Sequence, residues 1–448
     1  RDTSVTGVQT CALPILNKNG NFKSTVGFVL ACVGSAVGMG NIWMFPYRLG
    51  QYGGAAFLIP YLIFIALFGL VGLSAEFALG RMAKTGTLGA YAYCWKNKFG
   101  KYIGWLPLLG SLGIAIGYSV ILGWVFRSIQ GVLTNELFTN SIPAFFTNMT
   151  QSFSNVPCHF LVLFITCLLL FTSATNAIEK VNKVLMPAFF ILFIILAIRV
   201  SSFNGAIEGY KFLFVPKWEY LLNKETWIMA MGQAFFSLSI TGSGMIVYGA
   251  YLKDDVDIPK ASMQTAVFDT IAAMLAALAI MPAVFSFGID PVSGPSLMFL
   301  TLPEVFKQMP LGNFFALFFF ISVAFAGITS LINMLEAVCE SWQNRFHISR
   351  KKAVLLCGMI TFIVSVCIEN GDIVGQWMDV VTIYIIPFAA LLGAITIYYV
   401  LGWNHLKQEL DKGRIKPVGP TFKFLGKYVY VFLAIIILIL GILYNGIG

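Results

Sequence analysis

Long apolar stretches, separated by short polar ones, run along almost the entire chain. A helix needs about 20 mostly apolar residues to cross a bilayer, and eleven stretches meet this requirement. A further stretch near 294–310 is too short and polar to span, and we expect an outer hairpin at 290–311. The pattern predicts an all-α membrane protein with 11 transmembrane helices, at about 24–48, 53–79, 102–133, 158–176, 183–203, 226–251, 259–289, 312–345, 352–368, 373–402 and 427–445.

The composition narrows the class of protein. Of 448 residues, 58% are hydrophobic and only 11% are charged, whereas soluble domains carry about 25% charged residues. A soluble enzyme, a disordered protein and a secreted disulfide scaffold are therefore excluded. An outer-membrane barrel is disfavoured, because its strands would alternate apolar and polar residues.

The distribution of basic residues predicts the orientation. With the N-terminus in the cytoplasm, 21 of the 29 Lys and Arg residues fall on the inner side, as the positive-inside rule requires. We expect a multi-pass protein of the cell (inner) membrane, with the lipid bilayer as its partner. The net charge of +9 is explained by these loops, so no nucleic acid partner is expected, and the oligomeric state stays open.

The chain divides into two five-helix sets and flanking segments. Residues 1–16 have neither a helical period nor the pattern of a signal peptide, and we interpret them as a non-native sequence scar. The expected divisions are 17–203 for the first set, 204–225 for an outer loop, 226–402 for the second set, 403–426 for a cytoplasmic linker and 427–448 for the eleventh helix.

The first helix of each set carries an interruption. The first contains GSAVGMGN at 34–41, and the sixth contains SLSITGSG at 237–244. Small residues also serve close helix packing, but paired interruptions at corresponding positions indicate the central site of a transporter. Unwinding would free carbonyls for a cation, and the helix N-terminus that follows would favour a carboxylate.

Several motifs resemble the neurotransmitter:sodium symporter family, which has the LeuT-type fold. They are GSAVGMGNIWMFPYRLGQYGGAAFLIPY at 34–61, EFALGR at 76–81, IEKVNKVLMP at 178–187, GQAFFSLS at 232–239 and AGITS at 326–330. The resemblance covers nearly all of the chain after residue 20, and eleven spans resemble bacterial members. It implies a 5+5 inverted repeat with helices 1 and 6 unwound, and sodium-coupled uptake of an amino acid by alternating access.

The resemblance implies two sodium sites built from oxygen ligands, which suit a hard cation. For the hydroxyls of the second site, bonding back to their own helix is the alternative. The first site would comprise Ala36, Asn41, Ser237 and Asp269, and the second Gly34, Val37, Ala326, Thr329 and Ser330.

Asp269 departs from the family pattern, in which many members carry Asn. A carboxylate within the membrane is costly and usually functional. Two sodium ions and a zwitterion leave a charge of +2, which Asp269 would reduce to +1 without an added anion. We therefore predict no chloride requirement; a structural hydrogen bond between helices is the alternative.

The substrate pocket implied by the resemblance has no charged residue at its side-chain end, which favours a neutral amino acid. Gly38 leaves room for the substrate carboxylate, and Gly242 stands where some relatives carry a bulky aromatic residue. The vacated space would admit a hydrophobic or aromatic substrate, unless neighbours such as Met334 fill it. The pocket residues are Ser35, Ala36, Gly38, Met39, Gly40, Ile114, Tyr118, Phe236, Ser237, Ser239, Gly242, Ser330 and Met334.

Three acidic residues are assigned to support and gating. Glu76 and Glu336 are expected to brace the unwound segments. Members of the family often have an outer ion pair between an Arg of span one and an Asp of span ten. Here Met44 stands at the position of the Arg, and Asp379 at the position of the Asp. The spans contain neither a Ser/His/Asp nor an HExxH pattern, so an enzyme is not expected. A substrate-gated channel or sensor on the same fold is the alternative function.

Overall fold

The computed structural model describes residues 21–96, 99–139, 141–171, 174–288 and 297–447, and the segment 1–16 lies outside them. The first half of the chain forms α1 (Thr25–Ala36), η1 (Gly40–Met44), α2 (Phe45–Gln51), α3 (Ala55–Leu67), η2 (Phe68–Leu73), α4 (Ser74–Ala83), α5 (Thr87–Cys94), α6 (Gly100–Ile103), α7 (Trp105–Leu133), α8 (Glu136–Thr139), α9 (Ile142–Met149), α10 (Val156–Phe171), α11 (Ala174–Ser201), α12 (Ala206–Phe214) and η3 (Trp218–Leu222).

The second half of the chain is also helical. It forms α13 (Lys224–Ser237), α14 (Gly244–Ala250), α15 (Ile258–Ser286), η4 (Leu297–Thr301), α16 (Leu302–Gln308), α17 (Gly312–Phe346), α18 (Arg350–Cys367), α19 (Gly371–Asp379), η5 (Val380–Ile385), α20 (Ile386–Ile395), η6 (Thr396–Gly402), α21 (Trp403–Asp411), α22 (Pro420–Phe424), η7 (Leu425–Tyr430) and α23 (Val431–Leu443).

The helices account for the predicted membrane spans. Within the described ranges, seven helical segments are long and apolar enough to cross a bilayer, and the bent pair Thr25–Ala36 and Gly40–Gln51 makes an eighth. The shorter α10, α18 and the pair α13 and α14 lie at the remaining predicted positions. The all-α membrane class is confirmed, and the arrangement is compatible with eleven spans.

The first span is broken at its centre. α1 ends at Ala36, and Val37 takes extended dihedrals (φ −70°, ψ 109°). The segment that resumes at Gly40 is bent by 63° from α1. Glycine destabilises a helix by about 1 kcal/mol relative to alanine, so the three glycines at 34, 38 and 40 locate the break where the sequence predicted it.

The sixth span is broken at the corresponding place. α13 ends at Ser237, and α14 begins only at Gly244. Between them Ser239 and Gly242 have positive φ values of 52° and 70°, which stop a right-handed helix. The prediction that helices 1 and 6 are unwound is confirmed.

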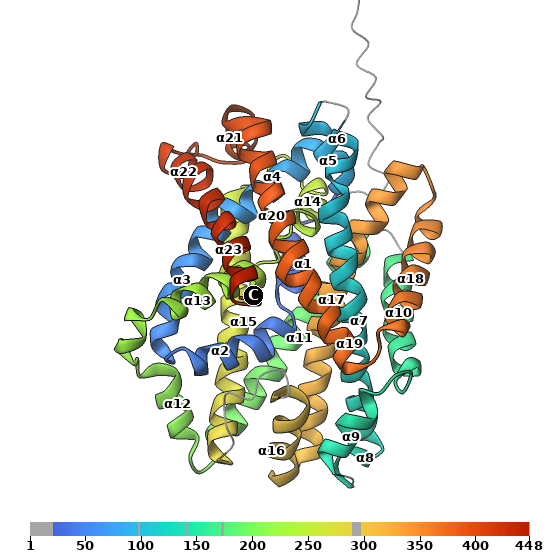
Figure 1. The fold of residues 1–448 in the computed structure, drawn as a ribbon, viewed down its shortest axis with the longest axis vertical. Coiled ribbons are helices and arrows are strands. Elements are labelled where there is room, and N and C mark those ends of the chain that lie inside the picture. The colour runs from blue at the N-terminus through green and yellow to red at the C-terminus, as the bar shows by residue number, and fades with distance from the viewer. Residues whose placement is uncertain (1–20, 97–98, 140, 172–173, 289–296, 448) are drawn as a thin grey trace, which may run out of the picture.

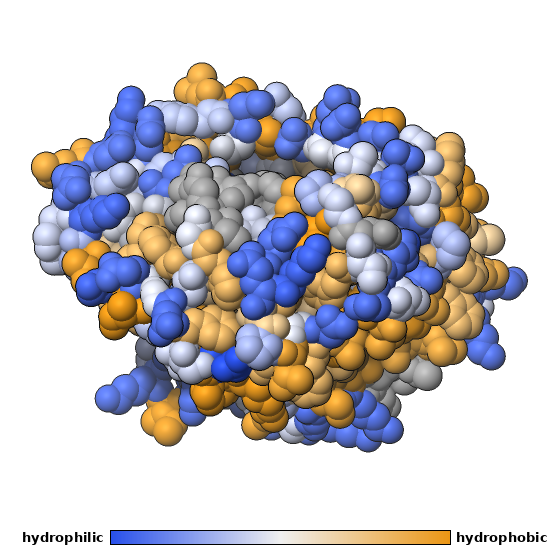
Figure 2. Space-filling view, turned by 90° about the horizontal axis from the view of Figure 1, so that it is seen from below, coloured by the Kyte–Doolittle hydropathy of each residue, from blue (hydrophilic) through white to orange (hydrophobic). Residues whose placement is uncertain are grey.

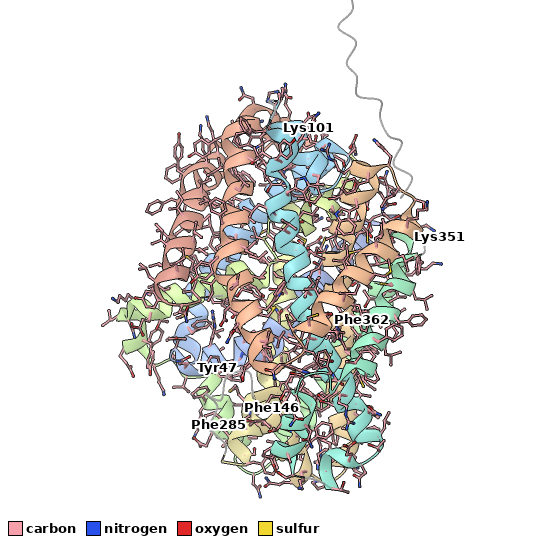
Figure 3. The ribbon with its side chains drawn as sticks, turned by 45° about the vertical axis from the view of Figure 1, so that its right-hand side comes forward. Tyr47, Lys101, Phe146, Phe285, Lys351 and Phe362 are labelled. Carbon is pink, nitrogen blue, oxygen red and sulfur yellow. The ribbon has the colours of Figure 1, made fainter. Side chains whose placement is uncertain are left out.

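Of the broken helices, α1 packs against α11, α15 and α17, and α13 and α14 pack against α3 and α4 (Figure 1). The helices α8, α9, α12 and α16 gather at one end, here called the α8–α9 end, and α5, α6, α21 and α22 gather at the other. Figure 2 looks onto the α8–α9 end: polar residues are frequent on this face, and apolar residues cover much of the side of the bundle. Lys101 and Lys351 lie in the half opposite Phe146 and Phe285 (Figure 3).

The fifth span differs from its predicted range. The sequence predicted a start near 183, but α11 extends through the polar residues that precede it. Glu179 forms an ion pair with Lys183 at 2.6 Å, and it accepts hydrogen bonds from Lys23 N (2.7 Å) and Ser24 Oγ (3.0 Å). The polar stretch is therefore helical, and it holds the start of α1.

The expected hairpin at 290–311 lies partly outside the described residues, which exclude 289–296. From Leu297 onwards the segment is helical, as η4 and α16, and it packs against α15 and α17.

Candidate functional site

A cavity of about 540 Å³ opens where the two helix breaks meet, and its wall is mostly apolar and aromatic. It extends past Phe146 of α9 and Asp372 of α19, towards the α8–α9 end. The charged side chains in its wall are Asp372 and Asp379. Every predicted substrate residue except Gly242 lines it: Ser35, Ala36, Gly38, Met39, Gly40, Ile114, Tyr118, Phe236, Ser237, Ser239, Ser330 and Met334.

The two breaks contact one another directly. Ser239 Oγ, in the break of the sixth span, donates a hydrogen bond to Ser35 O at 3.2 Å, at the end of α1. The carbonyls of the last helical turn have no partner within their own helix. The broken segments therefore share these free oxygens, and a change in one segment alters the hydrogen bonding of the other.

Gly38 leaves space that a side chain would fill. Tyr118 Oη accepts a hydrogen bond from Met39 N at 3.3 Å. A Cβ at Gly38 would lie 2.9 Å from that oxygen and 3.2 Å from Ser330 Oγ. The position therefore admits only glycine without displacing a polar group of the cavity.

Gly242 has a different place from the one that the sequence suggested. A Cβ at Gly242 would lie 2.7 Å from Tyr91 Oη and 2.8 Å from Ala389 O, so these atoms take the space of a side chain. Gly242 is needed for its positive φ, and its carbonyl accepts a hydrogen bond from Tyr91 Oη at 3.2 Å. The proposal of extra substrate volume at Gly242 is corrected, because that volume lies behind the cavity wall and is filled.

The residues assigned to the first sodium site form one buried group, here called the carboxylate group, with Asp269 at its centre. Asn41 Nδ2 donates to Asp269 Oδ1 at 2.7 Å, and Ser237 Oγ donates to Asp269 Oδ2 at 2.6 Å. Asn41 Oδ1 accepts from Gly38 N at 3.0 Å. Asn41 therefore presents its amide nitrogen, not its oxygen, to the carboxylate; Ala36 lies beside the group in the cavity wall.

The residues assigned to the second sodium site form another group, here called the carbonyl group, around Ser330 Oγ. Gly34 O (3.2 Å), Ser35 O (3.3 Å), Val37 O (3.1 Å) and Ala326 O (3.1 Å) all lie within hydrogen-bonding distance of this hydroxyl. A hydroxyl carries one hydrogen, so four carbonyl oxygens converge around a single donor. Such a surplus of acceptors favours a cation.

Thr329 contributes a further hydroxyl from α17. Its Oγ1 donates to Phe325 O at 3.1 Å and to Ala326 O at 2.9 Å. The bonding to its own helix that we considered as an alternative is therefore present. It uses only the hydrogen of the hydroxyl, so the lone pairs of Oγ1 stay available to a cation.

The three support and gate residues have different surroundings. Glu76 Oε1 accepts from Gly242 N at 2.7 Å, so it holds the break of the sixth span. Glu336 pairs with Arg350 at 2.6 Å and accepts from Tyr251 Oη at 2.6 Å. These two contacts lie beyond the end of α14, and the role of Glu336 in supporting the break stays a prediction. Met44 and Asp379 both line the cavity.

One buried polar residue beside the carbonyl group escaped the sequence analysis. Asn182 of α11 lies against Gly34; it stands in the motif at 178–187 but just before the predicted span, and the sequence analysis assigned it no role. An amide inside a spanning helix is itself a signal, because polar groups there need partners.

Two broken helices that face one cavity, with oxygen-rich groups beside it, define a class of protein: a secondary transporter with the LeuT-type fold. The comparisons with known proteins agree. The sequence profile of the sodium:neurotransmitter symporter family matches residues 19–158 and 146–446. The chain belongs to this family, which consists of sodium-coupled transporters rather than enzymes.

Individual relatives match over nearly their whole length. The uncharacterized sodium-dependent transporter YhdH of Bacillus subtilis (strain 168) is 34% identical, over 94% of this chain and 97% of the relative. A sodium-dependent transporter of Methanocaldococcus jannaschii, MJ1319, is 29% identical over 91% and 87%. The crystal structure of MhsT in complex with L-phenylalanine superposes with a TM-score of 0.84 at 30% identity, covering 94% of this chain and 99% of MhsT.

Proposed function

We propose that this protein imports a neutral, hydrophobic or aromatic α-amino acid together with sodium, by alternating access. The observation that carries the proposal is the convergence of both helix breaks and the carbonyl group on one cavity of about 540 Å³. Backbone carbonyls at a helix break bind cations, and half-helix N-termini favour carboxylates. The substrate carboxylate would lie near Gly38 and Tyr118.

The cavity wall supports the substrate class. Met39, Ile114, Phe236 and Met334 line it, and apolar side chains would bind an apolar substrate through burial, worth about 25 cal/mol per Å². A charged substrate side chain would be desolvated without a partner. With Gly242 outside the wall, the size of the substrate depends on these four residues, and MhsT, solved with L-phenylalanine, is a precedent.

The proposal includes two sodium ions and no chloride. The first ion would bind the carboxylate group, where Asp269 supplies a negative charge, and the second the carbonyl group. In the deprotonated form, Asp269 lowers the total charge of two ions and a zwitterion from +2 to +1. An added anion is then not needed to offset charge in the membrane interior, where unbalanced charge is costly.

The orientation belongs to the same proposal. With the N-terminus in the cytoplasm, the cavity reaches towards the outer side, which is the α8–α9 end. Phe146 and Asp372 would then form part of the outer entrance, and the protein would load its substrate from outside the cell membrane.

Binding and uptake in proteoliposomes test this function. A radiolabelled aromatic amino acid should bind in sodium but not in potassium, and should accumulate against its gradient. Uptake should be unchanged when gluconate replaces chloride. Flux that only dissipates a gradient would indicate a channel, and chloride stimulation at saturating sodium would refute the assignment of Asp269.

Competition among Trp, Tyr, Leu and Ala tests the substrate class. We expect the larger apolar amino acids to compete best, because the cavity wall is mostly apolar. Preferential competition by Ala would contradict a large-substrate pocket while leaving sodium coupling intact.

A further inference from the structure

Asn182 is a buried amide whose oxygen has no partner in the part of the chain that the structure describes. Its Nδ2 donates to Ile178 O, one turn earlier in α11, at 2.8 Å. Because a carbonyl must face the nitrogen, this bond assigns the two ends of the amide, and Oδ1 points away from its own helix. An amide oxygen without a donor is unfavourable inside a membrane protein.

The free oxygen points to the edge of the carbonyl group. A Cβ placed on Gly34 would overlap Asn182 Oδ1, and it would lie 3.1 Å from Thr329 Cβ. Gly34 contributes a carbonyl to the group, and Thr329 contributes a hydroxyl beside it. α11 thus brings the negative end of an amide dipole to the place where α1 and α17 already collect surplus oxygens.

The surface of α1 is shaped to receive this side chain. A Cβ at Gly27 would overlap Glu179, just as one at Gly34 would overlap Asn182. Gly27 and Gly34 are seven residues apart, so they lie on the same face of α1. Glu179 and Asn182 are three residues apart, so they lie on the same face of α11. Two glycines on one face of α1 therefore accommodate two polar side chains on one face of α11.

We propose that the amide dipole of Asn182 raises the affinity of the carbonyl group for sodium. This inference rests on the proposed function, because it assumes that the carbonyl group binds the second sodium ion. The dipole is oriented by the Ile178 bond before the ion arrives, so its stabilisation requires no rearrangement. A cation nearby would in turn compensate the unpartnered oxygen of Asn182.

The test measures the half-saturating sodium concentration for binding of a radiolabelled aromatic amino acid. Asn182→Ala should raise it roughly three- to tenfold, the range expected for loss of one polar contact. Asn182→Asp keeps an oxygen at the same place and should bind sodium at least as tightly as the wild type. Substrate affinity at saturating sodium should change less than about twofold in both variants.

Asn155→Ala is the matched control. Asn155 is also a buried asparagine, and its amide has no hydrogen-bond partner among the described residues, but it lies beside Gly123 and His159 rather than beside Gly34. It should leave the half-saturating sodium concentration unchanged. Equal shifts in Asn182→Ala and Asn182→Asp, or no shift in either, would overturn the inference.

A second measurement guards against misfolding. The rise in Tm that sodium causes in the absence of substrate should be smaller for Asn182→Ala than for the wild type, whatever the Tm in potassium; an equal rise would overturn the inference. If wild-type binding does not depend on sodium, the proposed function fails. If binding to the wild type depends on sodium, but both Asn182 variants have the same sodium dependence as the wild type, this inference fails and the proposed function stands.

Discussion

The carboxylate group and the carbonyl group lie on either side of the same helix break, but their hydrogen bonds are balanced differently. In the carboxylate group, both oxygens of Asp269 receive donors, from Asn41 Nδ2 and Ser237 Oγ. In the carbonyl group, four carbonyl oxygens surround the single hydrogen of Ser330. One group is satisfied by the protein itself, and the other has more acceptors than donors.

This difference suggests an order of events. A cation at the carbonyl group would meet oxygens that are already free and need no rearrangement. A cation at the carboxylate group would have to displace the amide of Asn41, which also holds Gly38 N through Oδ1. We therefore expect sodium to bind the carbonyl group without substrate, and the carboxylate group only together with the substrate carboxylate.

Asp269→Ala should have the largest effect on this comparison. Removing the carboxylate takes the acceptor from both Asn41 Nδ2 and Ser237 Oγ, and a hydrogen bond to a charged group is worth about 1.5–3 kcal/mol, so sodium-dependent substrate binding should fall at least about 100-fold. Sodium binding without substrate, followed through the fluorescence of Trp43 and Trp124 in the cavity wall, should persist.

Asp269→Asn is the matched variant, because it keeps the shape and removes the charge. If the charge matters for the reason proposed, added chloride should partly restore substrate binding. Loss of the sodium signal in the absence of substrate would contradict the separation of the two groups.

Ser330→Ala should have the next largest effect, on the other group. It removes the hydroxyl around which the carbonyls converge, and a hydrogen-bonding group next to a charge contributes about 1.5–3 kcal/mol. The half-saturating sodium concentration without substrate should rise roughly tenfold or more. Ser322→Ala is the control and should not change it, because Ser322 is a buried serine whose hydroxyl donates to Phe318 O of its own helix.

Gly38→Ala tests the element that both groups share. Gly38 N donates to Asn41 of the carboxylate group, and its Cα faces Ser330 of the carbonyl group. A methyl group 2.9 Å from Tyr118 Oη is overpacked, at a cost of about 1–3 kcal/mol. Substrate affinity should fall about tenfold, and an unchanged affinity would show that the break has room to spare.

Glu76→Gln should have the smallest effect. The amide keeps an oxygen that can accept from Gly242 N, a bond of 2.7 Å in the structure, and it removes only the charge. Substrate affinity should change less than about threefold in equilibrium binding. A larger loss would show that the charge of Glu76, and not just its hydrogen bond, supports the sixth span.

The sequence predicted the helical class and both breaks, because these depend on local chemistry. A run of about 20 apolar residues specifies a spanning helix, and glycines at 34, 38 and 40 weaken one. The start of α11 was predicted too late, because Glu179 and Lys183 suggested a loop. Their charges are neutralised by each other and by the backbone of Lys23, contacts that depend on tertiary structure.

The candidate site was predictable as a set of residues but not as an arrangement. Motifs supplied a part of the cavity wall but not Trp124, Phe146 or Asp372, and they could not show that Tyr91 fills the space behind Gly242. They also could not show which atom of Asn41 faces Asp269, since that depends on the hydrogen bond from Gly38 N. Asn182 was missed because its neighbour, Gly34, lies far away in the sequence.

The attachment of α1 to α11 has a mechanical consequence. One carboxylate, Glu179, accepts hydrogen bonds from both Lys23 N and Ser24 Oγ, so the two residues that lead into α1 are both held by α11. If that half-helix tilts to open the opposite side of the bundle, it must either break both bonds together or pull α11 with it. The two bonds that Glu179 accepts would therefore oppose such a tilt.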